Sequence, residues 1–286
     1  EFNIFQKICE EILDFGESIQ YMAILIAKVD CLNGFAELAI ANNFTKPLIH
    51  KNYDVNLSEA RHPVVEKTLE TGDFTPNSTN LNQRKFVHLI TGPNMSGKST
   101  YIRQVALIQL LAQMGSFVPA EKAEISIVDG IYTRIGAGDA LAQGLSTFMV
   151  EIIENGKILN NATKDSLIIL DEIGRGTSTI DGLSIARAVI EHIHDKIKAK
   201  TLFATHFHEL TSLSQRLKYL ENYHVGIISI DDEKHSFKFS HKVELGGTDK
   251  SYGVEVAKLA GIPIEVINRA NELLNKNSQS QLKLDI

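Results

Sequence analysis

The chain has 286 residues, of which 43% are hydrophobic and 22% charged, with a formal net charge of −6, two cysteines and no tryptophan. These figures are typical of a globular protein and exclude collagen-like, disulfide-scaffold and wholly disordered classes. The excess of 35 acidic over 29 basic side chains disfavours strong non-specific nucleic-acid binding by this segment alone. No apolar run approaches the roughly 18 residues of a membrane span and no signal peptide opens the chain, so we expect a cytoplasmic protein without membrane contact.

The first 45 residues are predicted to form a long helix. Apolar side chains recur there with the 3.5-residue period of a coiled coil, at Phe5, Ile8, Ile12, Phe15, Ile19, Met22, Ile26 and Val29. A continuous helix to about Asn42 would be roughly 60 Å long. This segment carries seven acidic and two basic residues and therefore −5 of the total charge, which leaves the remainder near neutral. Two interpretations stay open: a helix packed on the following domain, or an arm that connects this domain to something upstream.

Two further features concern the context of the chain. It begins with Glu1 rather than methionine, in the middle of the periodic pattern, and we interpret it as a piece of a longer protein. Cys9 and Cys31 form no metal or redox motif. We expect both to behave as small buried hydrophobes in a reducing cytoplasm.

Pro47 ends the predicted helix, because its ring disfavours helix at the preceding residue, and the chain is turn-rich from there to about Leu81. Strands then alternate with helices, which predicts an α/β fold with a largely parallel central sheet. The expected strands are 86–90, 167–170 and 201–204, and the expected helices are 99–114 and 183–197. Further on, we expect a hairpin of 227–230 and 237–239, short helices at 254–260 and 263–274, and a frayed tail from Asn275.

A glycine-rich loop follows the first of these strands and satisfies the pattern G-x-x-x-x-G-K-[ST]. Its residues are Gly92, Pro93, Asn94, Met95, Ser96, Gly97, Lys98 and Ser99, followed by Thr100. A strand before the motif and a helix after it are the context of a phosphate-binding loop. Backbone N–H groups and the helix N-terminus would surround the β-phosphate of ATP. Lys98 would reach between the β- and γ-phosphates, and the Ser99 hydroxyl would be a ligand of Mg²⁺.

Two other strands end in polar residues suited to the same chemistry. Asp171 and Glu172 follow four apolar residues, and ligands bind at this carboxyl edge in open α/β sheets. Asp171 is placed to hold Mg²⁺ through water, and Glu172 to polarise an attacking water. The strand at 201–204 leads to His206, which is predicted to contact the γ-phosphate.

At this point the motifs resemble those of the MutS family of mismatch-repair proteins. The matching segments cover essentially the whole chain: 60–66 (ARHPVVE), 91–100 (TGPNMSGKST), 146–151 (STFMVE), 171–182 (DEIGRGTSTIDG), 205–210 (THFHEL) and 251–260 (SYGVEVAKLA). The resemblance implies a P-loop ATPase of the ABC type, with a central sheet and flanking helices. It identifies residues 92–99 with the Walker A loop, Asp171 and Glu172 with the Walker B pair, and His206 with the switch histidine. Phe74 and His241 occupy the positions that sandwich adenine in that family.

The resemblance also implies a dimer with two composite ATP sites. Ser146 is similar to the signature serine, which faces the ATP of the opposite subunit from the start of a helix. Arg175 and residues 177–181 resemble the loop that passes between the two sites. The implied domains are the end of a lever or clamp arm (1–45), the ATPase (46–250), a helix-turn-helix dimerisation element (251–275) and a flexible tail (276–286). Mismatched DNA would be bound by upstream domains, and a MutL-type repair factor would be a partner.

Other functions and other signals were weighed against this hypothesis. A recombination-type relative of the family shares the same ATPase. A P-loop kinase would transfer a phosphoryl group to a small acceptor, and a non-catalytic dimerisation module would bind nucleotide without turnover. His206 and His208 are a poor zinc pair, because no cysteine lies near them. His192 and His194 are interpreted as surface residues, and Lys196, Lys198 and Lys200 as a solvated helix end.

Overall fold

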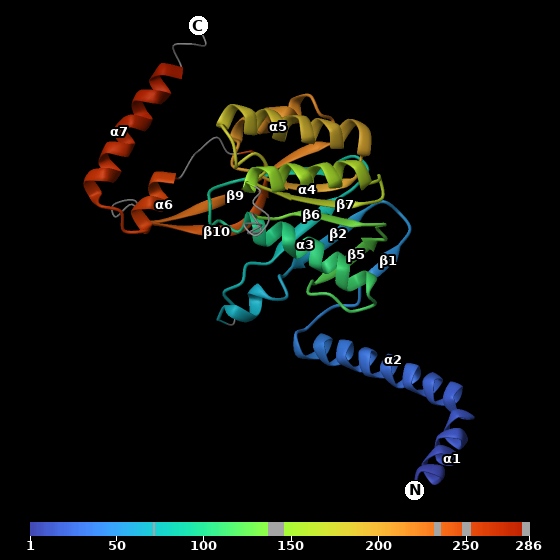
Figure 1. Cartoon of the computed structure of the whole chain (residues 1–286). Coiled ribbons are helices and arrows are strands. Elements are labelled where there is room, and N and C mark those ends of the chain that lie inside the picture. Colours follow the sequence, from blue (N-terminus) through green and yellow to red (C-terminus); the bar gives the residue numbers. More distant parts are fainter. Residues whose placement is uncertain (71, 137–145, 232–235, 248–252, 282–286) are drawn as a thin grey trace.

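The computed structural model describes residues 1–70, 72–136, 146–231, 236–247 and 253–281 (Figure 1). Its larger sheet has six strands in the order β10-β9-β4-β8-β7-β6. They are β4 (Val87–Thr91), β6 (Ile131–Arg134), β7 (Leu167–Asp171), β8 (Lys200–Ala204), β9 (Leu220–Asp231) and β10 (Ser236–Leu245). All neighbours pair in parallel except β9 and β10. The predicted parallel sheet and the predicted hairpin are therefore confirmed, with hairpin strands longer than expected; residues 232–235 between them lie outside the described part.

A second sheet takes three of its four strands from the region that we expected to be turn-rich, so that expectation was incomplete. Its order is β1-β5-β2-β3, and its strands are β1 (Leu48–His50), β2 (Val55–Ala60), β3 (Asn77–Leu81) and β5 (Lys122–Ser126). Strand β3 alternates buried and exposed positions, but two of its buried side chains are Asn77 and Thr79. A strand whose inward positions are polar gives no apolar alternation in the sequence, which explains why this one was missed.

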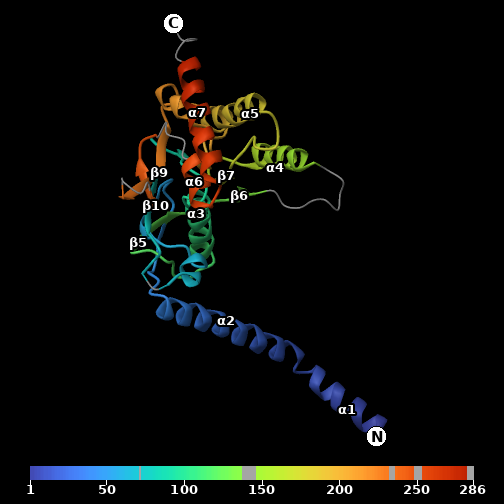
Figure 2. The same ribbon diagram turned by 90° about the vertical axis from the view of Figure 1, so that its left-hand side faces the viewer.

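The helices divide the molecule into layers, and Figures 1 and 2 show α3 between the two sheets and α4 and α5 on the far side of the larger one. The helices are α3 (Lys98–Gln113), α4 (Thr147–Asn161) and α5 (Thr179–His192). Alternate residues of the larger sheet face opposite layers, as the two-residue period of a strand requires. Leu167 and Ile169 join the cluster around α3, whereas Ile168 and Leu170 join the cluster around α5. Both faces are thus buried, which is why the strands read as continuous apolar runs.

The predicted helix at 183–197 begins earlier, at Thr179, and its last turn is a π-helix over Ile193–Ile197. Two side chains that we expected on the surface are buried there. His194 is only 6% exposed and its Nε2 accepts a hydrogen bond from the Tyr219 backbone N–H at 3.1 Å. Lys200 is 1% exposed because it opens β8 rather than ending the helix, and its ammonium lies 4.1 Å from the ring centroid of Tyr53. Cation–π contact stabilises a lysine in such a place.

The N-terminal arm projects away from the sheets in both views (Figures 1 and 2). It consists of two helices, α1 (Phe2–Leu13) and α2 (Gly16–Ala41), so the expectation of one continuous helix was wrong at Asp14 and Phe15. Only Ala39 of the two helices is buried. The periodic apolar side chains are about half to two-thirds exposed, from 49% at Ile8 to 67% at Val29. The arm therefore does not pack on the domain that follows, while its connection to something upstream stays a prediction.

The two cysteines share this exposure, which corrects the prediction that both are buried. Cys9 is partly exposed and Cys31 is exposed, and both thiols are free. No described helix, this apolar arm included, is both long and hydrophobic enough to cross a bilayer.

Two helices end the described chain, as the sequence predicts: α6 (Gly253–Leu259) and α7 (Ile264–Gln281). A turn at Gly261 joins them, with a backbone φ of +78° that suits glycine. Helix α7 continues past Asn275 to Gln281, so residues 276–281 are helical rather than the start of a tail. Residues 248–252, at the predicted domain boundary, lie outside the described part.

Candidate phosphate and nucleotide site

Three neighbouring parallel strands of the larger sheet end at one edge, and each leads into residues that the sequence analysis assigned to nucleotide binding. Strand β4 runs into the glycine-rich loop, β7 into Asp171 and Glu172, and β8 into His206. Strand β8 pairs with both of the others, with Asp171 opposite Ala204 and Ile90 opposite Ala204. Because parallel strands end at the same edge, the three segments meet where ligands bind in α/β sheets. The order of the strands confirms the juxtaposition on which the sequence hypothesis depends.

The loop after β4 closes tightly against the sheet. Gly92 has a φ of +142°, and a Cβ added there would lie 3.1 Å from the carbonyl oxygen of Val225 on β9. Gly97 is left-handed at +103° and caps α3. Ser96 is not among the residues with positive φ, so serine is compatible with the loop at that position. The loop is thus a turn that presents backbone groups at the N-terminus of α3.

Lys98 is folded back onto this loop. Its Nζ donates hydrogen bonds to the carbonyl oxygens of Gly92 at 2.7 Å and Pro93 at 2.8 Å, and the residue is 4% exposed. Burial lowers the pKa of Lys98, while the negative charges of Glu172 and Asp171 act in the opposite direction. The buried ammonium group of Lys98 is positioned to bind an anion, which would replace the two carbonyl oxygens as its hydrogen-bond acceptors.

Asp171 is 7% exposed at the end of β7. Burial raises its pKa, while the Ser99 hydroxyl and the positive charges of Arg103 and Lys98 act in the opposite direction. The Nη2 of Arg103 lies 3.6 Å from Oδ2 of Asp171. The other carboxylate oxygen, Oδ1, is buried and has no hydrogen-bond partner among the described residues. One oxygen of the carboxylate is therefore free for a further ligand.

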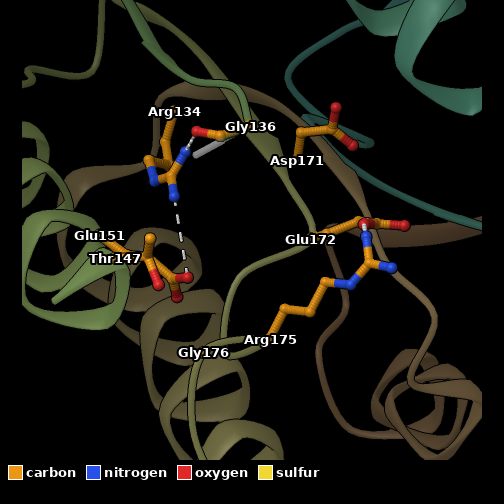
Figure 3. Close-up of a pocket in the computed structure, with 8 residues that line it drawn as sticks. All are labelled: Arg134, Gly136, Thr147, Glu151, Asp171, Glu172, Arg175 and Gly176. Atoms are coloured by element: carbon orange, nitrogen blue, oxygen red, sulfur yellow. Dashed lines mark hydrogen bonds and ion pairs between the residues drawn. The ribbon is translucent and has the colours of Figure 1, made fainter. Parts of the chain in front are cut away.

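Glu172 has a left-handed backbone, with a φ of +54°, and its N–H donates to the carbonyl oxygen of Ala204 at 2.9 Å. Non-glycine residues in this conformation cost about 1–2 kcal/mol and cluster at functional sites. The carboxylate is paired with the guanidinium of Arg175, which points toward it in Figure 3. Because Arg175 is 63% exposed on its side chain, the pair lies at the open side of the site.

His206 lies between the other groups. The residue is half-buried, and burial lowers the pKa of its imidazole, while the charge of Glu172 raises it. The neutral ring is therefore favoured near neutral pH. Its Nδ1 is buried without a hydrogen-bond partner among the described residues. The Ser96 hydroxyl on the glycine-rich loop is a further buried oxygen in the same condition.

Phe74 and His241, predicted to sandwich adenine, line one cavity of about 220 Å³ beside the loop. His241 is left-handed, with a φ of +52°, and its Nδ1–H donates to the carbonyl oxygen of Ser96 at 2.8 Å. Met95 and Gly97 of the loop also line the cavity, as does Leu69. The tertiary structure therefore brings an aromatic ring and an imidazole, 167 positions apart in the sequence numbering, to the flank of the loop.

Ser146 caps helix α4, which begins where the sequence analysis expected a helix. Its hydroxyl accepts a hydrogen bond from the Met149 backbone N–H at 3.2 Å, and the residue is exposed. The neighbouring Thr147 lines a cavity of about 300 Å³ together with Asp171 and Glu172 (Figure 3). Ser146 is not itself among the residues that line this cavity. The residues 137–145 that precede it lie outside the described part of the chain.

The sequence analysis missed a buried pair that supports this cavity. Arg134, at the end of β6, lies 3.8 Å from Glu151 (Figure 3) and 3.1 Å from Glu154, and both glutamates are on α4. Glu151 also accepts a hydrogen bond from the Gly174 N–H at 2.6 Å, so it ties α4 to the segment that follows Glu172. Glu151 ends one of the family-like segments, but Arg134 stands on a short strand that the sequence did not predict.

The described residues include no group of three or more His, Cys, Asp or Glu side chains that could hold a metal ion by themselves.

Comparison with known proteins supports the same family as the motifs. The model of MutS domain V matches residues 88–278. The chain is 52% identical over 281 residues to "DNA mismatch repair protein MutS" of Staphylococcus haemolyticus (strain JCSC1435), covering 98% of this chain and 32% of that protein. It is 49% identical over 292 residues to the protein of the same name from Staphylococcus aureus (strain MRSA252), covering 99% and 33%. The chain spans about a third of the length of these curated relatives, and it belongs to the MutS family, of which it carries domain V.

Proposed function

We propose that this chain is an ABC-type P-loop ATPase that binds ATP with Mg²⁺ at the glycine-rich loop and hydrolyses it. One observation supports this above all. Three buried polar atoms without hydrogen-bond partners among the described residues border the loop, namely Ser96 Oγ, Asp171 Oδ1 and His206 Nδ1. Native structures leave few such groups, and each calls for a ligand, an ion or a water. A triphosphate with its metal ion supplies partners for all three.

The residues fit the nucleotide. Lys98 would exchange its two carbonyl acceptors for phosphate oxygens, which as anions are the stronger acceptors. Residues 92–100 would surround the phosphates, and the cavity between Phe74 and His241 would take the adenine. An apolar, ring-lined cavity beside a cationic loop matches the two halves of a nucleotide.

The residues fit a magnesium ion as well. The Ser99 hydroxyl and the Asp171 carboxylate lie close enough to influence each other, and one oxygen of Asp171 is unpaired among the described residues. Oxygen donors of this kind are the ligands that Mg²⁺ prefers. When bound, the ion would neutralise charge that develops on the transferred phosphoryl group.

Glu172 would accept the proton of the attacking water, and His206 would hydrogen-bond the γ-phosphate through its neutral ring. In the present conformation the Glu172 carboxylate is paired with the guanidinium of Arg175. For Glu172 to orient water, Arg175 has to release it. Because Arg175 is exposed at the open side of the site, a second copy that approaches this face would be able to draw it away.

A dimer with composite sites completes the proposal. The N-terminus of α4, capped by the exposed Ser146, would meet the γ-phosphate bound by the partner copy, where the positive end of the helix favours an anion. Helices α6 and α7 would act as a helix-turn-helix dimerisation element. The test is phosphate release measured at rising protein concentration. We expect the activity per molecule to rise as dimers form, and an activity independent of concentration would contradict the composite site.

The role in the whole protein is proposed from the relatives. Because they are named DNA mismatch repair proteins, we propose that nucleotide state moves the arm of residues 1–45, which would link this ATPase to upstream domains that bind mismatched DNA. A MutL-type factor would be the downstream partner. The match to MutS domain V favours this function over a P-loop kinase, and the names of the relatives favour the mismatch-repair branch over a recombination-type one.

A further inference from the structure

The side chain of one arginine of the ATPase body bonds the C-terminal end of helix α2. Arg61, directly after β2, donates from Nη2 to the backbone carbonyl oxygens of Asn42 at 3.0 Å and Asn43 at 2.9 Å. Asn42 is the C-cap of α2, and Asn43 is left-handed with a φ of +51°. The last carbonyl groups of a helix have no partner within it and carry the negative end of its dipole. A guanidinium group is therefore a favourable cap at this end.

The same guanidinium reaches the nucleotide side of the molecule. Its Nη1 donates to Oε1 of Glu66 at 2.7 Å, and the two side chains are only 21% and 29% exposed. Glu66 belongs to the 3-10 helix η1 (Val65–Thr68). Val65 from this helix, and Leu69 immediately after it, line the cavity that we assign to adenine. Two hydrogen-bonded side chains, Glu66 and Arg61, thus link the wall of that cavity to the end of α2.

The side chain of His62 holds the start of η1. His62 is 7% exposed, and its Nδ1 accepts hydrogen bonds from the N–H groups of Val64 at 3.3 Å and Val65 at 3.2 Å. The start of η1 is therefore held by His62, and Glu66 in its first turn is held by Arg61.

We propose that Arg61 is the positioning residue that transmits nucleotide occupancy to the arm, through Glu66 and η1. A nucleotide seated between Phe74 and His241 displaces Val65 and Leu69. Glu66 moves with them, and the guanidinium carries the displacement to the carbonyl groups that end α2. This inference rests on the proposed ATP binding and adds to it the path by which the arm responds. The geometry favours a planar guanidinium for the task, because it bonds two partners at once in fixed directions.

The experiment measures the position of the arm and the affinity for nucleotide separately. Spin labels are attached to the native, exposed Cys31 on the arm and to a Lys196→Cys substitution on the body, in a Cys9→Ser background. Distance distributions are recorded with and without a non-hydrolysable ATP analogue and Mg²⁺. A fluorescent ATP analogue is titrated against every variant. The matched control is Arg187→Gln, since Arg187 is a half-exposed arginine that pairs with Glu191 on its own helix.

In the parent and in Arg187→Gln, we expect the inter-label distance to shift when the nucleotide binds. In Arg61→Gln the shift is lost while the affinity for the fluorescent analogue stays the same. Should Arg61→Gln fail to fold, Arg61→Lys takes its place, because lysine keeps the charge but not the two-directional reach. A full shift in the Arg61 variant overturns the inference, as does a parent that binds the analogue without any shift. A parent that fails to bind the analogue instead overturns the proposed ATP site itself.

Discussion

Gly174 and Gly182 touch through their backbones: a Cβ on Gly182 would lie 2.1 Å from the carbonyl oxygen of Gly174, and a Cβ on Gly174 would lie 2.5 Å from that of Gly182. This contact presses the segment that follows Glu172 against the first turn of α5. The Gly174 N–H is held at the same time by Glu151. The position of Glu172 is therefore fixed by backbone contact and by one buried carboxylate.

Replacing Gly182 with alanine tests this contact. Alanine favours a helix over glycine by about 1 kcal/mol, so a free helical site would be stabilised. Here the methyl group collides with backbone, and we expect a loss of at least about 3 kcal/mol in the free energy of unfolding. The matched control is Gly156→Ala on α4, where nothing lies within 4 Å of the added Cβ. Urea unfolding of both variants checks the prediction, and equal effects would contradict it.

Replacing Lys98 with methionine should abolish tight nucleotide binding. The methylene stem remains, but the ammonium that would meet the phosphates is lost. Hydrogen bonds to charged groups contribute about 1.5–3 kcal/mol, so we expect the dissociation constant of a fluorescent ATP analogue to rise by roughly 10- to 150-fold. Thermal unfolding without nucleotide serves as the check on folding. An unchanged affinity would remove Lys98 from the proposed site.

Replacing Glu172 with glutamine should separate binding from hydrolysis. Glutamine keeps the size of the side chain but does not accept the proton of the attacking water. We expect the nucleotide affinity to remain and the rate of phosphate release to fall by about 100- to 10,000-fold, the usual contribution of a general base. The exposed Glu121→Gln is the control for loss of one carboxylate. Undiminished turnover would rule out the role given to Glu172.

The two partners of Arg134 should differ in what they contribute. Glu151 is 5% exposed on its side chain and Glu154 is 45% exposed. Removing one partner of a buried pair costs about 3–5 kcal/mol, because the other charge is left uncompensated. An exposed pair contributes below about 1 kcal/mol. We therefore expect Glu151→Ala to destabilise the fold far more than Glu154→Ala in denaturant unfolding. Comparable losses of stability in the two variants would contradict the larger contribution predicted for the buried Arg134–Glu151 pair.

His88 should make the free energy of unfolding depend on pH. This residue of β4 is 1% exposed, and burial lowers the pKa of its imidazole to about 3. The unfolded chain protonates His88 near its ordinary pKa of about 6.5, whereas the folded chain does not. Stability is therefore lost as pH falls from about 6.5 toward 3, by up to about 1.4 kcal/mol per pH unit from this group.

A His88→Phe variant keeps a ring against Tyr223, 4.5 Å away between centroids, but does not titrate. Its unfolding free energy, measured across this pH range, should fall less steeply than that of the parent. Parallel curves would mean that His88 binds its proton equally in both states.

The sequence was most informative where one local rule dictates one structure. The strand, loop and helix around Lys98 were predicted because glycine, lysine and serine in that spacing have a local conformational and chemical meaning. The apolar strand that ends in Asp171 was found for a similar reason, since strands buried on both faces appear as apolar runs. Strand β3 of the second sheet was missed because its buried positions include Asn77 and Thr79, so the sequence shows no apolar alternation there. The break at Asp14 and Phe15 in the arm has no proline, and its one sequence signal is Gly16, where α2 begins.

What the sequence by itself determined is the chemistry of the chain: the phosphate-type loop, the two carboxylates after a buried strand, and the family to which these motifs belong. Tertiary structure alone decided how these groups are held. The pairing of Arg175 with Glu172, the support of Gly174 by Glu151, and the link from Arg61 to the end of the arm all join residues through side-chain directions and backbone angles. The spacing of a motif specifies which groups follow one another along the chain. The contacts between those groups depend on how the layers pack in three dimensions, and no local pattern encodes that packing.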